Sequence, residues 1–476
     1  MRRWWPALAV LLAALLCVFL PPVGGGGRPR RATAAPRPLE VGRLGRRILV
    51  LAPHPDDEVV GAGGLIQTAL RAGDQVWVAV ATSGESSTPA AIRALHVLRP
   101  TPRDFALLGQ IRRNESRAGT RVLGLPPSHL IFLGYADGSL TPLWVDSWNC
   151  RQPRVSGGTH VAYSLLDRGF DPHVAYCAPH LLDDLERLLR QVRPDAVILP
   201  DPADHHPDHA GLADFTWAAV LAYDRSRPAA APEPSLYGYL VHYPDWPQRW
   251  GYDPAGQEAF PSTWTGGPVR LVRLPLAKPV TDGKERALLR YRSQLAVSPE
   301  FLESFVRRDE LFTRRPLVLR LGPRWTELGQ VRPLSSTFRV LRRGRGIPRI
   351  VRLSRYAGFA ATLWARSSGP GRLEFRLSGR DVPMERLTLR FYAWQVRPGG
   401  PDRRLEFFWQ QGRGRWFLEP GRGADGIRPA WSRAPGGLTW SCPSGDAPWQ
   451  VAASLVEGGR LVGWTPWLAV SGPKTE

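Results

Sequence analysis

Two short polar clusters combine imidazole and carboxylate side chains in a way that suits metal-assisted hydrolysis. They are His54-Pro-Asp56-Asp57-Glu58 and Asp204-His205-His206-Pro-Asp208-His209. A catalytic zinc ion takes about three such ligands and keeps one position open for water. His54 and Asp57 are close enough in the chain to reach one ion, and Asp56 between them could accept a proton from the water that the ion activates.

The segments before both clusters have the composition of buried strands. Residues 48–52, 76–81 and 196–199 are continuous apolar runs, which are typical of parallel strands covered on both faces. Residues 181–192 have the periodicity of a helix. The alternation of such segments up to about residue 315 predicts an α/β fold, with a Rossmann-like, mostly parallel sheet and helices on both faces. Ligands of such sheets bind outside the carboxyl ends of the strands, so the two clusters can meet there.

Each cluster also has a purely structural explanation. An aspartate at the start of a helix is a common N-cap, and helical stretches open near Gly61 and Ala210. Both clusters follow strand ends, however, and they hold four histidines and five acids between them. This combination favours a functional site.

The last third of the chain has a different pattern. Residues 372–377, 386–391 and 404–409 alternate between apolar and polar side chains, and Gly- and Pro-rich turns separate them. Half-buried antiparallel strands explain this alternation. We therefore expect two folded units, an α/β domain at residues 45–320 and an all-β, sandwich-like accessory domain at residues 330–476.

The amino terminus has the layout of a signal peptide. Two arginines, Arg2 and Arg3, precede an apolar run at residues 7–20, and small residues follow at positions 32–35. An uncleaved membrane anchor is the alternative, because the apolar stretch is nearly long enough to span a bilayer. Residues 1–40 are thus expected to be a signal peptide or anchor plus a linker. The remainder would be extracytoplasmic, either secreted or anchored to the membrane.

Composition and charge limit the possible partners. Hydrophobic residues make up 43% of the 476 residues, which is enough for a sizeable core. The formal net charge is +21, but the arginines that cause it are scattered along the chain. A nucleic-acid-binding protein gathers its charge on one face, so we expect no nucleic acid. Association with anionic polymers at a cell surface or cell wall fits the charge better.

Three cysteines lie beyond the amino-terminal apolar run. Cys150 and Cys177 could form a disulfide in an oxidising compartment, or they could remain two buried thiols. Cys442 has no expected partner.

Several motifs together resemble one known family. Residues 52–58, followed by Gly61-Ala-Gly-Gly64, resemble the signature of the PIG-L/LmbE-type N-acetylglucosaminyl deacetylases. Residues 206–209 resemble the second motif of that family. Further similar segments are residues 112–115 with 122–124, residues 132–138, and residues 284–294 with 308–312. The resemblance covers more than half of the chain.

The resemblance implies a metal site. His54, Asp57 and His209 match the ligands of Zn²⁺ or another divalent transition metal, and Asp56 matches the general base. His206 matches the histidine that polarises the amide carbonyl.

Further roles follow from the same resemblance. Asp208 would orient His206, while Arg112 and Asp137 match positions that hold sugar or phosphate groups. Arg112 could instead be a solvated arginine on a helix, and Asp137 with Gly138 could be a plain turn.

The general acid is not fixed by the resemblance. Some members have a tyrosine just before the second motif, where this chain has Asp204. We expect His206 to protonate the leaving amine, because imidazole is the commonest general acid near neutral pH. Tyr135 and His205 are the alternatives.

The predicted function is that of an exported, zinc-dependent hydrolase that removes the N-acetyl group from an N-acetylglucosamine-type sugar or glycoconjugate. One alternative is a related amidase that cleaves a larger amide. Another is a catalytically idle surface protein whose β domain binds glycans by stacking sugars on aromatic rings. We expect those aromatic residues mainly to fill the core of the β domain.

Overall fold

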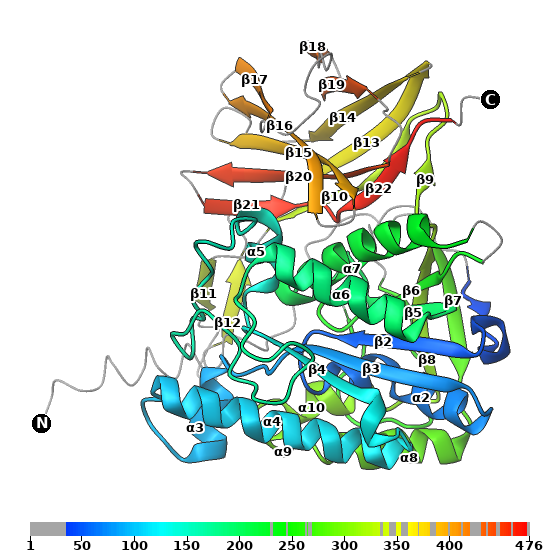
Figure 1. Cartoon of the computed structure of the whole chain (residues 1–476), viewed down its shortest axis with the longest axis vertical. Coiled ribbons are helices and arrows are strands. Elements are labelled where there is room, and N and C mark those ends of the chain that lie inside the picture. Colours follow the sequence, from blue (N-terminus) through cyan, green and yellow to red (C-terminus); the bar gives the residue numbers. More distant parts are fainter. Residues whose placement is uncertain are drawn as a thin grey trace, which may run out of the picture.

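The computed structural model describes residues 35–473, apart from 229–231, 244–245, 262–263, 265–268, 334–336, 342–348, 354–359, 370, 381–386, 398–399, 411–412, 419–429, 435–436, 444–447 and 458–459. Residues 1–34, which hold the expected signal peptide or anchor, lie outside the described residues. The α/β domain begins earlier than the expected residue 45, because residues 37–38 pair with the sheet and Leu39, Val41 and Leu44 are buried in its core. An α/β domain and a domain of antiparallel strands lie one above the other (Figure 1).

The α/β domain is built on an eight-stranded sheet with the order β1-β7-β8-β6-β5-β2-β3-β4. The strands are β1 (Arg37–Pro38), β2 (Arg47–Ala52), β3 (Gln75–Thr82), β4 (Leu130–Tyr135), β5 (Ala196–Pro200), β6 (Ser235–Tyr239), β7 (Arg270–Pro275) and β8 (Asp309–Arg315). Strands β2 to β6 are parallel to one another, and β1 is parallel to β7, whereas β8 is antiparallel to both β6 and β7. The sheet is mostly parallel, as predicted.

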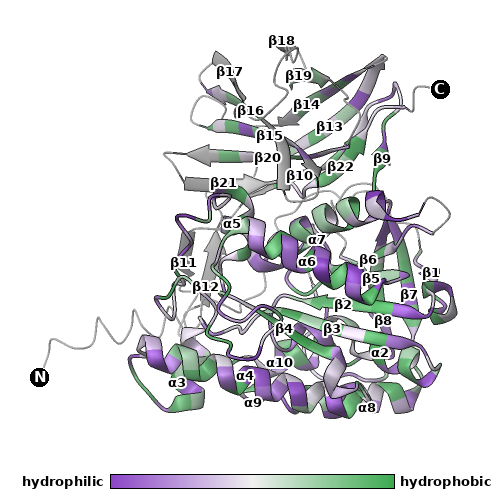
Figure 2. Cartoon of the chain, in the orientation of Figure 1, coloured by the Kyte–Doolittle hydropathy of each residue, from purple (hydrophilic) through white to green (hydrophobic). Residues whose placement is uncertain are grey.

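Helices cover both faces of this sheet. They are α2 (Asp57–Arg71), α3 (Thr88–Leu95), α4 (Pro102–Leu123), α5 (Leu140–Asp146), α6 (Ala178–Val192), α7 (Pro207–Ser226), α8 (Lys278–Leu288), α9 (Arg292–Leu295) and α10 (Pro299–Glu303), with short 3-10 turns η1 (Val41–Leu44) and η2 (Pro127–His129). Alternate residues of β2 enter different cores, because Ile48 packs with α2 and α8 while Leu49 packs with α6 and α7. Figure 2 shows β2 as hydrophobic, whereas α4 and α6 carry both hydrophilic and hydrophobic residues. Burial on both faces explains why the strands are uninterrupted apolar runs.

The second domain consists of mostly antiparallel strands in two facing halves that share one strand. They are β9 (Leu319–Arg320), β10 (Thr326–Pro333), β13 (Ala360–Gly369), β14 (Arg372–Arg380), β15 (Thr388–Arg397), β16 (Gly400–Gln410), β17 (Arg413–Leu418), β18 (Ala430–Ala434), β19 (Gly437–Pro443), β20 (Trp449–Glu457), β21 (Arg460–Trp464) and β22 (Leu468–Ser471). Strands β11 (Thr337–Leu341) and β12 (Arg349–Leu353) form a separate two-stranded sheet. Strand β10 pairs with β13 on one side and with β21 on the other. Phe375 of one half lies 4.7 Å from Phe391 of the other, measured between ring centroids. The predicted sandwich-like fold is confirmed.

Tryptophan side chains join the two domains. The ring of Trp144 on α5 lies 5.3 Å from that of Trp394 and 5.6 Å from that of Trp467, both from the β domain. In addition, Gln450 donates a hydrogen bond of 3.3 Å to the backbone oxygen of Asp214 on α7. Buried aromatic residues of the β domain thus lie in its core, as Trp440 does, and in its junction with the α/β domain, as Trp394 and Trp467 do.

The open question about the cysteines has a clear answer in the structure. Cys150 and Cys177 form a disulfide, and Cys442 is a buried free thiol. Within the described residues, no helix has both the length and the apolarity needed to cross a bilayer.

Candidate metal centre

Histidines and carboxylates from several loops converge at the carboxyl end of the parallel sheet. His54 follows β2, the cluster at residues 204–209 follows β5, Asp137 follows β4 and His242 follows β6. The ring centroid of His206 lies 4.8 Å from that of His54 and 5.1 Å from that of His209. The two polar clusters of the sequence thus form one site.

The three expected metal ligands are in mutual contact. Asp57 Oδ2 lies 3.0 Å from His54 Nδ1 and 3.2 Å from His209 Nε2. One ligand atom from each of His54, His206 and His209 lies within 4.8 Å of the others, and Asp57, His209 and His242 form a second such group. His206 and His242 are therefore further candidates for the same ion.

The donor atoms of this site fit a divalent transition metal. His209 is fully buried, yet neither of its ring nitrogens has a partner in hydrogen-bond geometry. The nearest carboxylate oxygens, from Asp57 and Asp204, lie at 3.2 and 3.3 Å. A buried imidazole without hydrogen bonds is costly, and metal coordination removes that cost. Imidazole and carboxylate donors together suit zinc.

The charges around the two ligand histidines favour a cation. Burial by itself would lower the pKa of His54, but hydrogen bonds to Asp137, Asp208 and Asp57 hold it well above its usual value. Burial likewise opposes the charge of His209, but Asp57 and Asp204 raise its pKa to about 10. The carboxylates therefore favour protonated imidazoles, and a metal ion that binds these nitrogens would displace the protons.

Asp56 precedes the expected ligand Asp57, and its carboxylate contacts Arg112. Its φ of 134° is rare for a residue other than glycine, and its backbone N–H donates to Glu58 Oε2 at 2.9 Å. Its Oδ2 lies 3.3 Å from Nη2 of Arg112. Burial raises the pKa of Asp56 to about 8, although the charge of Arg112 opposes this rise. The carboxylate is thus placed to accept a proton next to the ligand set.

Arg112 is buried and does not project into solvent. Its guanidinium donates to the backbone oxygens of Gly84 and Pro55, at 2.6 and 2.9 Å. With the contact to Asp56, these bonds connect α4 to the loops that follow β2 and β3. The structure places Arg112 as a support for Asp56.

Glu58 stabilises the backbone turn at Asp56 through its buried carboxylate. Its carboxylate accepts hydrogen bonds from the hydroxyls of Ser116 and Tyr291 and from the backbone of Asp56. All three polar side chains, Glu58, Ser116 and Tyr291, are buried. They hold the backbone that presents Asp56 and Asp57.

The second motif is organised differently from the sequence expectation. The backbone N–H of Asp208 donates to Nδ1 of His206 at 3.2 Å, but the Asp208 carboxylate does not bind the His206 ring. It accepts instead from the backbone of Gly138 and Leu140, at 2.6 and 2.9 Å, and lies 3.1 Å from His54 Nε2. Asp208 therefore positions His54, and only its backbone orients His206.

Asp137 belongs both to a turn and to the metal centre. Gly138 has a φ of 78°, so the turn suggested by the sequence is present. Asp137 Oδ1 nevertheless lies 3.2 Å from His54 Nε2, and its other oxygen accepts from the backbone of Ser86 at 2.8 Å. Its carboxylate is thus committed to the ligand cluster.

The two alternative general acids lie away from the cluster's centre. The hydroxyl of Tyr135 donates to Asp184 on α6 at 2.7 Å. The ring of His205 packs against Tyr243, with centroids 5.1 Å apart.

Helix α2 is shaped by its glycines. A Cβ atom on Gly61 would lie 2.4 Å from the ring of Tyr239, and one on Gly64 would lie 2.5 Å from Leu276. The helix is interrupted at Ala62, where φ and ψ are −146° and 16°. The small residues let α2 approach the sheet closely, which brings Asp57 in its first turn to the other ligands.

Sequence reasoning missed His242, Asp204 and Glu58 as site residues. His242 offered one usable signal, because it comes three residues after the end of β6. Asp204 was noted for its spacing only, but its Oδ2 lies 3.3 Å from His209 Nδ1 and accepts from the backbone of Val241 and His242 at 2.9 and 3.0 Å.

These features define an α/β protein with a cluster of histidines and carboxylates, a candidate metal centre, at the carboxyl end of its sheet. Residues 49–220 match the family described as PIG-L, GlcNAc-PI de-N-acetylase. The chain thus contains a PIG-L/LmbE family domain and an additional carboxyl-terminal β region.

Curated relatives are similar to this chain over a comparable part of its length. The chain is 30% identical over 183 residues to a 1D-myo-inositol 2-acetamido-2-deoxy-alpha-D-glucopyranoside deacetylase of Actinosynnema mirum, which covers 37% of this chain and 55% of that protein. A protein of the same name from Rhodococcus opacus is 26% identical over 284 residues, covering 56% of this chain and 87% of the relative. The chain therefore spans about half the length of the first of these relatives. Among solved structures, the conserved protein TT1542 from Thermus thermophilus is 25% identical, with 58% of this chain and 97% of that chain covered and a TM-score of 0.35.

Proposed function

We propose that this protein is an exported, zinc-dependent N-deacetylase that acts on an N-acetylglucosamine-type sugar or glycoconjugate. The observation that carries the proposal is the contact of one Asp57 oxygen with both His54 and His209, with Asp56 beside them. His54, Asp57 and His209 hold the ion, and imidazole with carboxylate favours zinc over the hard cations.

The chemistry is the hydrolysis of an acetamide. When bound, the zinc ion acts as a Lewis acid toward the carbonyl and lowers the pKa of water. Asp56 accepts a proton from the water that attacks the carbonyl carbon, and Arg112 keeps its carboxylate in place. His206 accepts a backbone hydrogen bond at Nδ1, so a neutral His206 carries its proton on Nε2 and can donate a hydrogen bond from there to the acetamide oxygen. As the C–N bond breaks, the proton taken by Asp56 passes to the leaving nitrogen, and acetate and a free amine are released. Asp56 therefore replaces His206, which we first expected to be the general acid, because the one N–H of His206 is used at the carbonyl oxygen.

The substrate class rests on the relatives. The Actinosynnema mirum and Rhodococcus opacus proteins are named as deacetylases of a 2-acetamido sugar. An acetamide on a sugar ring is the bond that the proposed site would cleave.

Export is supported by chemistry at two places in the chain. Disulfides persist in oxidising compartments, and Cys150 is bonded to Cys177. The amino-terminal sequence has the layout of a signal peptide or anchor. We place the folded domains on the outer side of the membrane, where cell-wall or surface glycans would be their substrates.

Acetate release tests this function. The purified protein is incubated with N-acetylated mono- and oligosaccharides, with and without a chelator, and acetate and free amine are measured. We expect equal amounts of both products, loss of activity with the chelator and recovery with zinc. Asp56→Asn should lower kcat by at least about 100-fold while zinc stays bound, because a general base contributes about that much or more. Near-wild-type turnover by Asp56→Asn, or products without acetate, would refute the proposal.

A further inference from the structure

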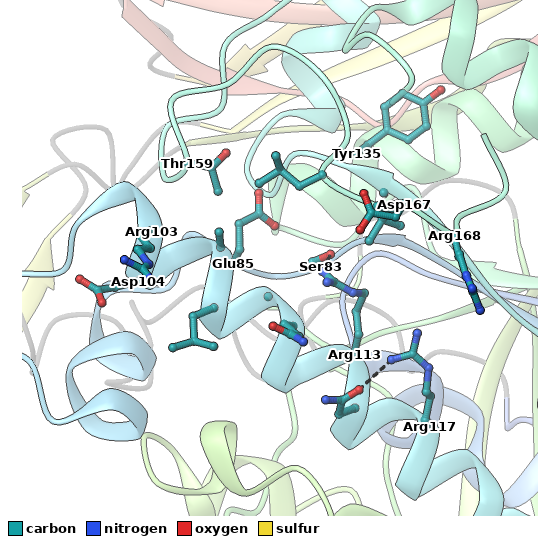
Figure 3. A pocket seen from close by; sticks show the side chains of 18 of the residues that line it. Ser83, Glu85, Arg103, Asp104, Arg113, Arg117, Tyr135, Thr159, Asp167 and Arg168 are labelled. Atoms are coloured by element: carbon teal, nitrogen blue, oxygen red, sulfur yellow. Dashed lines mark hydrogen bonds between the residues drawn. The ribbon is translucent and has the colours of Figure 1, made fainter. Parts of the chain in front are cut away.

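A large cavity lies beside the metal centre and is lined mainly by α4 and by the loop that precedes α6 (Figure 3). Its volume is about 700 Å³. A second cavity of about 570 Å³ adjoins it, and both are lined by Arg117 and Arg168. Because they share these lining residues, we describe the two cavities together as one groove along α4.

Arginines dominate this groove. Arg113, Arg117 and Arg121 are spaced four residues apart on α4, so they lie on one face of the helix. Arg168 comes from the loop before α6 and lines both cavities. We call these four residues the arginine groove. The guanidinium of Arg117 also stacks on the ring of Phe132, 5.0 Å from its centroid.

The guanidinium groups of the arginine groove are not neutralised by ion pairs. Arg113 donates to the Ser83 hydroxyl at 2.7 Å, and Arg117 donates to the Asn114 side chain at 2.8 Å. Across the described part of the chain, no carboxylate forms a salt bridge with Arg113, Arg117, Arg121 or Arg168. These groups remain available to an external anion.

Arg187, which lines the second cavity, differs in this respect. It pairs with Asp171 at 3.0 Å and Asp183 at 3.2 Å, and it also contacts Asp184. The absence of such partners is thus a property of the arginine groove and not of every arginine nearby.

The acidic residues Asp104 and Asp167, which line the first cavity, interact with residues other than the four arginines. Asp104 caps α4 through bonds of 2.8 and 2.7 Å from the backbone and hydroxyl of Thr101. Asp167 lies 3.9 Å from His173. Among the described residues, neither of these carboxylates forms an ion pair with an arginine of the arginine groove.

The inner end of the groove reaches the residues around the metal centre. Glu85 lines the cavity, is buried, and accepts from the backbone of Asp137 at 3.0 Å through Oε1. Its Oε2 has no hydrogen-bond partner, so it can accept from a sugar hydroxyl. A saccharide that extends from the metal centre would therefore meet the arginine groove next.

We propose that the arginine groove binds an anionic group on a saccharide unit next to the N-acetylated one, so that the substrate of this protein is an acidic glycan. This inference rests on the proposed deacetylase function. Arginine is suited to the role because its planar guanidinium binds carboxylate or phosphate through two parallel hydrogen bonds. A uronic acid and a phosphate substituent both offer this chemistry.

The test compares substrates that differ in charge. The neutral substrate is tetra-N-acetylchitotetraose, the carboxylate substrate is a hyaluronan tetrasaccharide, and the phosphate substrate is a chito-oligosaccharide phosphorylated on one sugar. For the double variant Arg117→Gln/Arg168→Gln we expect the KM ratio of anionic to neutral substrate to rise at least about 10-fold, which is the low end for losing charged hydrogen bonds. Arg117→Lys should keep most of the wild-type ratio. The control is Arg290→Gln, an exposed arginine that lines neither cavity.

The outcomes separate the possible ligands. A larger effect on the hyaluronan substrate assigns the groove to a uronic acid, and a larger effect on the phosphorylated substrate assigns it to a phosphate. An unchanged KM ratio, or an equal rise of KM on neutral and anionic substrates, would overturn the proposal. Tighter binding of a single-stranded oligonucleotide than of either anionic saccharide would also overturn it, because the groove would then serve a nucleic acid.

Direct binding distinguishes failure of this inference from failure of the deacetylase function. Calorimetry with an oligogalacturonate, which has no acetamide, measures the groove without catalysis. If wild type binds it and the double variant loses at least about 10-fold in affinity, the groove is supported even without acetate release. Absence of binding by active wild-type enzyme would overturn the groove and leave the deacetylase function intact.

Discussion

A buried ion pair between Lys284 and Glu310 supports the interrupted helix α2. Because the helix breaks at Ala62, the backbone N–H groups of Gly64 and Leu65 begin a second helical segment, and they donate to the Glu310 carboxylate at 2.7 and 2.8 Å. Lys284 Nζ lies 2.7 Å from the same carboxylate and also donates to the backbone of α2. The side chains of Lys284 and Glu310 are only 2% and 3% exposed.

Lys284→Met would leave this carboxylate buried without its counterion. Removal of one partner of a buried pair costs about 3–5 kcal/mol, and we expect a loss of that size in the free energy of unfolding. The matched control is Lys278→Met on the same helix α8, where Lys278 is 84% exposed and pairs with Asp282 at 2.7 Å. An exposed pair contributes less than about 1 kcal/mol.

Urea unfolding followed by tryptophan fluorescence measures both variants. Hydrogen exchange of α2 peptides reports on the amides of Gly64 and Leu65 directly, and these should exchange faster in Lys284→Met. The double variant Lys284→Met/Glu310→Gln should recover part of the loss, because no unpaired charge stays buried. Equal stabilities for Lys284→Met and Lys278→Met would refute the reasoning.

Three further predictions concern separate parts of the chain. Cys150→Ser/Cys177→Ser should lower the stability by about 3 kcal/mol, because the disulfide closes a loop with a sequence separation of 27; an unchanged melting temperature without reductant would contradict this. Burial alone raises the pKa of Asp214 well above its usual value, so the stability that the protonated Asp214 contributes is lost as pH rises through that pKa. The melting temperature of Asp214→Asn should therefore exceed that of wild type by more at pH 8 than at pH 4. A difference that does not depend on pH would contradict this. Gly61→Ala would place its Cβ 2.4 Å from Tyr239, so we expect the free energy of unfolding to fall by about 1–3 kcal/mol. Zinc binding, measured by calorimetry, should also be weaker. Wild-type values for both quantities would rule out the close approach.

Composition was enough to predict three adjacent strands of the eight-stranded sheet, but not its other strands or the contacts between elements. Strands β2, β3 and β5 were predicted because strands covered on both faces must be apolar throughout. The contact of Glu310 with α2 could not be predicted, since it joins residues 246 positions apart at a break in the helix. Periodicity reports which face is buried, but it does not report what lies against that face.

The candidate site was predicted more completely in its residues than in its contacts. Ligands of such sheets bind outside the carboxyl ends of the strands, which predicted that His54 and His209 would meet. The structure places both in one cluster. The role of Asp208 differs, because its carboxylate meets His54 and a backbone loop that arrives from β4. Such a role depends on side-chain direction, which spacing along one segment does not fix. His242 was missed because residues 235–239 mix tyrosine and glycine and were not recognised as a buried strand.

Zinc content, measured on purified and dialysed protein together with acetate release, decides whether His54, Asp57 and His209 hold a catalytic ion. Wild type should retain about one zinc ion per chain, and His209→Ala should retain almost none and release no acetate. A His209→Ala variant that keeps both its zinc and its acetate release would show that the ion, or the reaction, lies elsewhere.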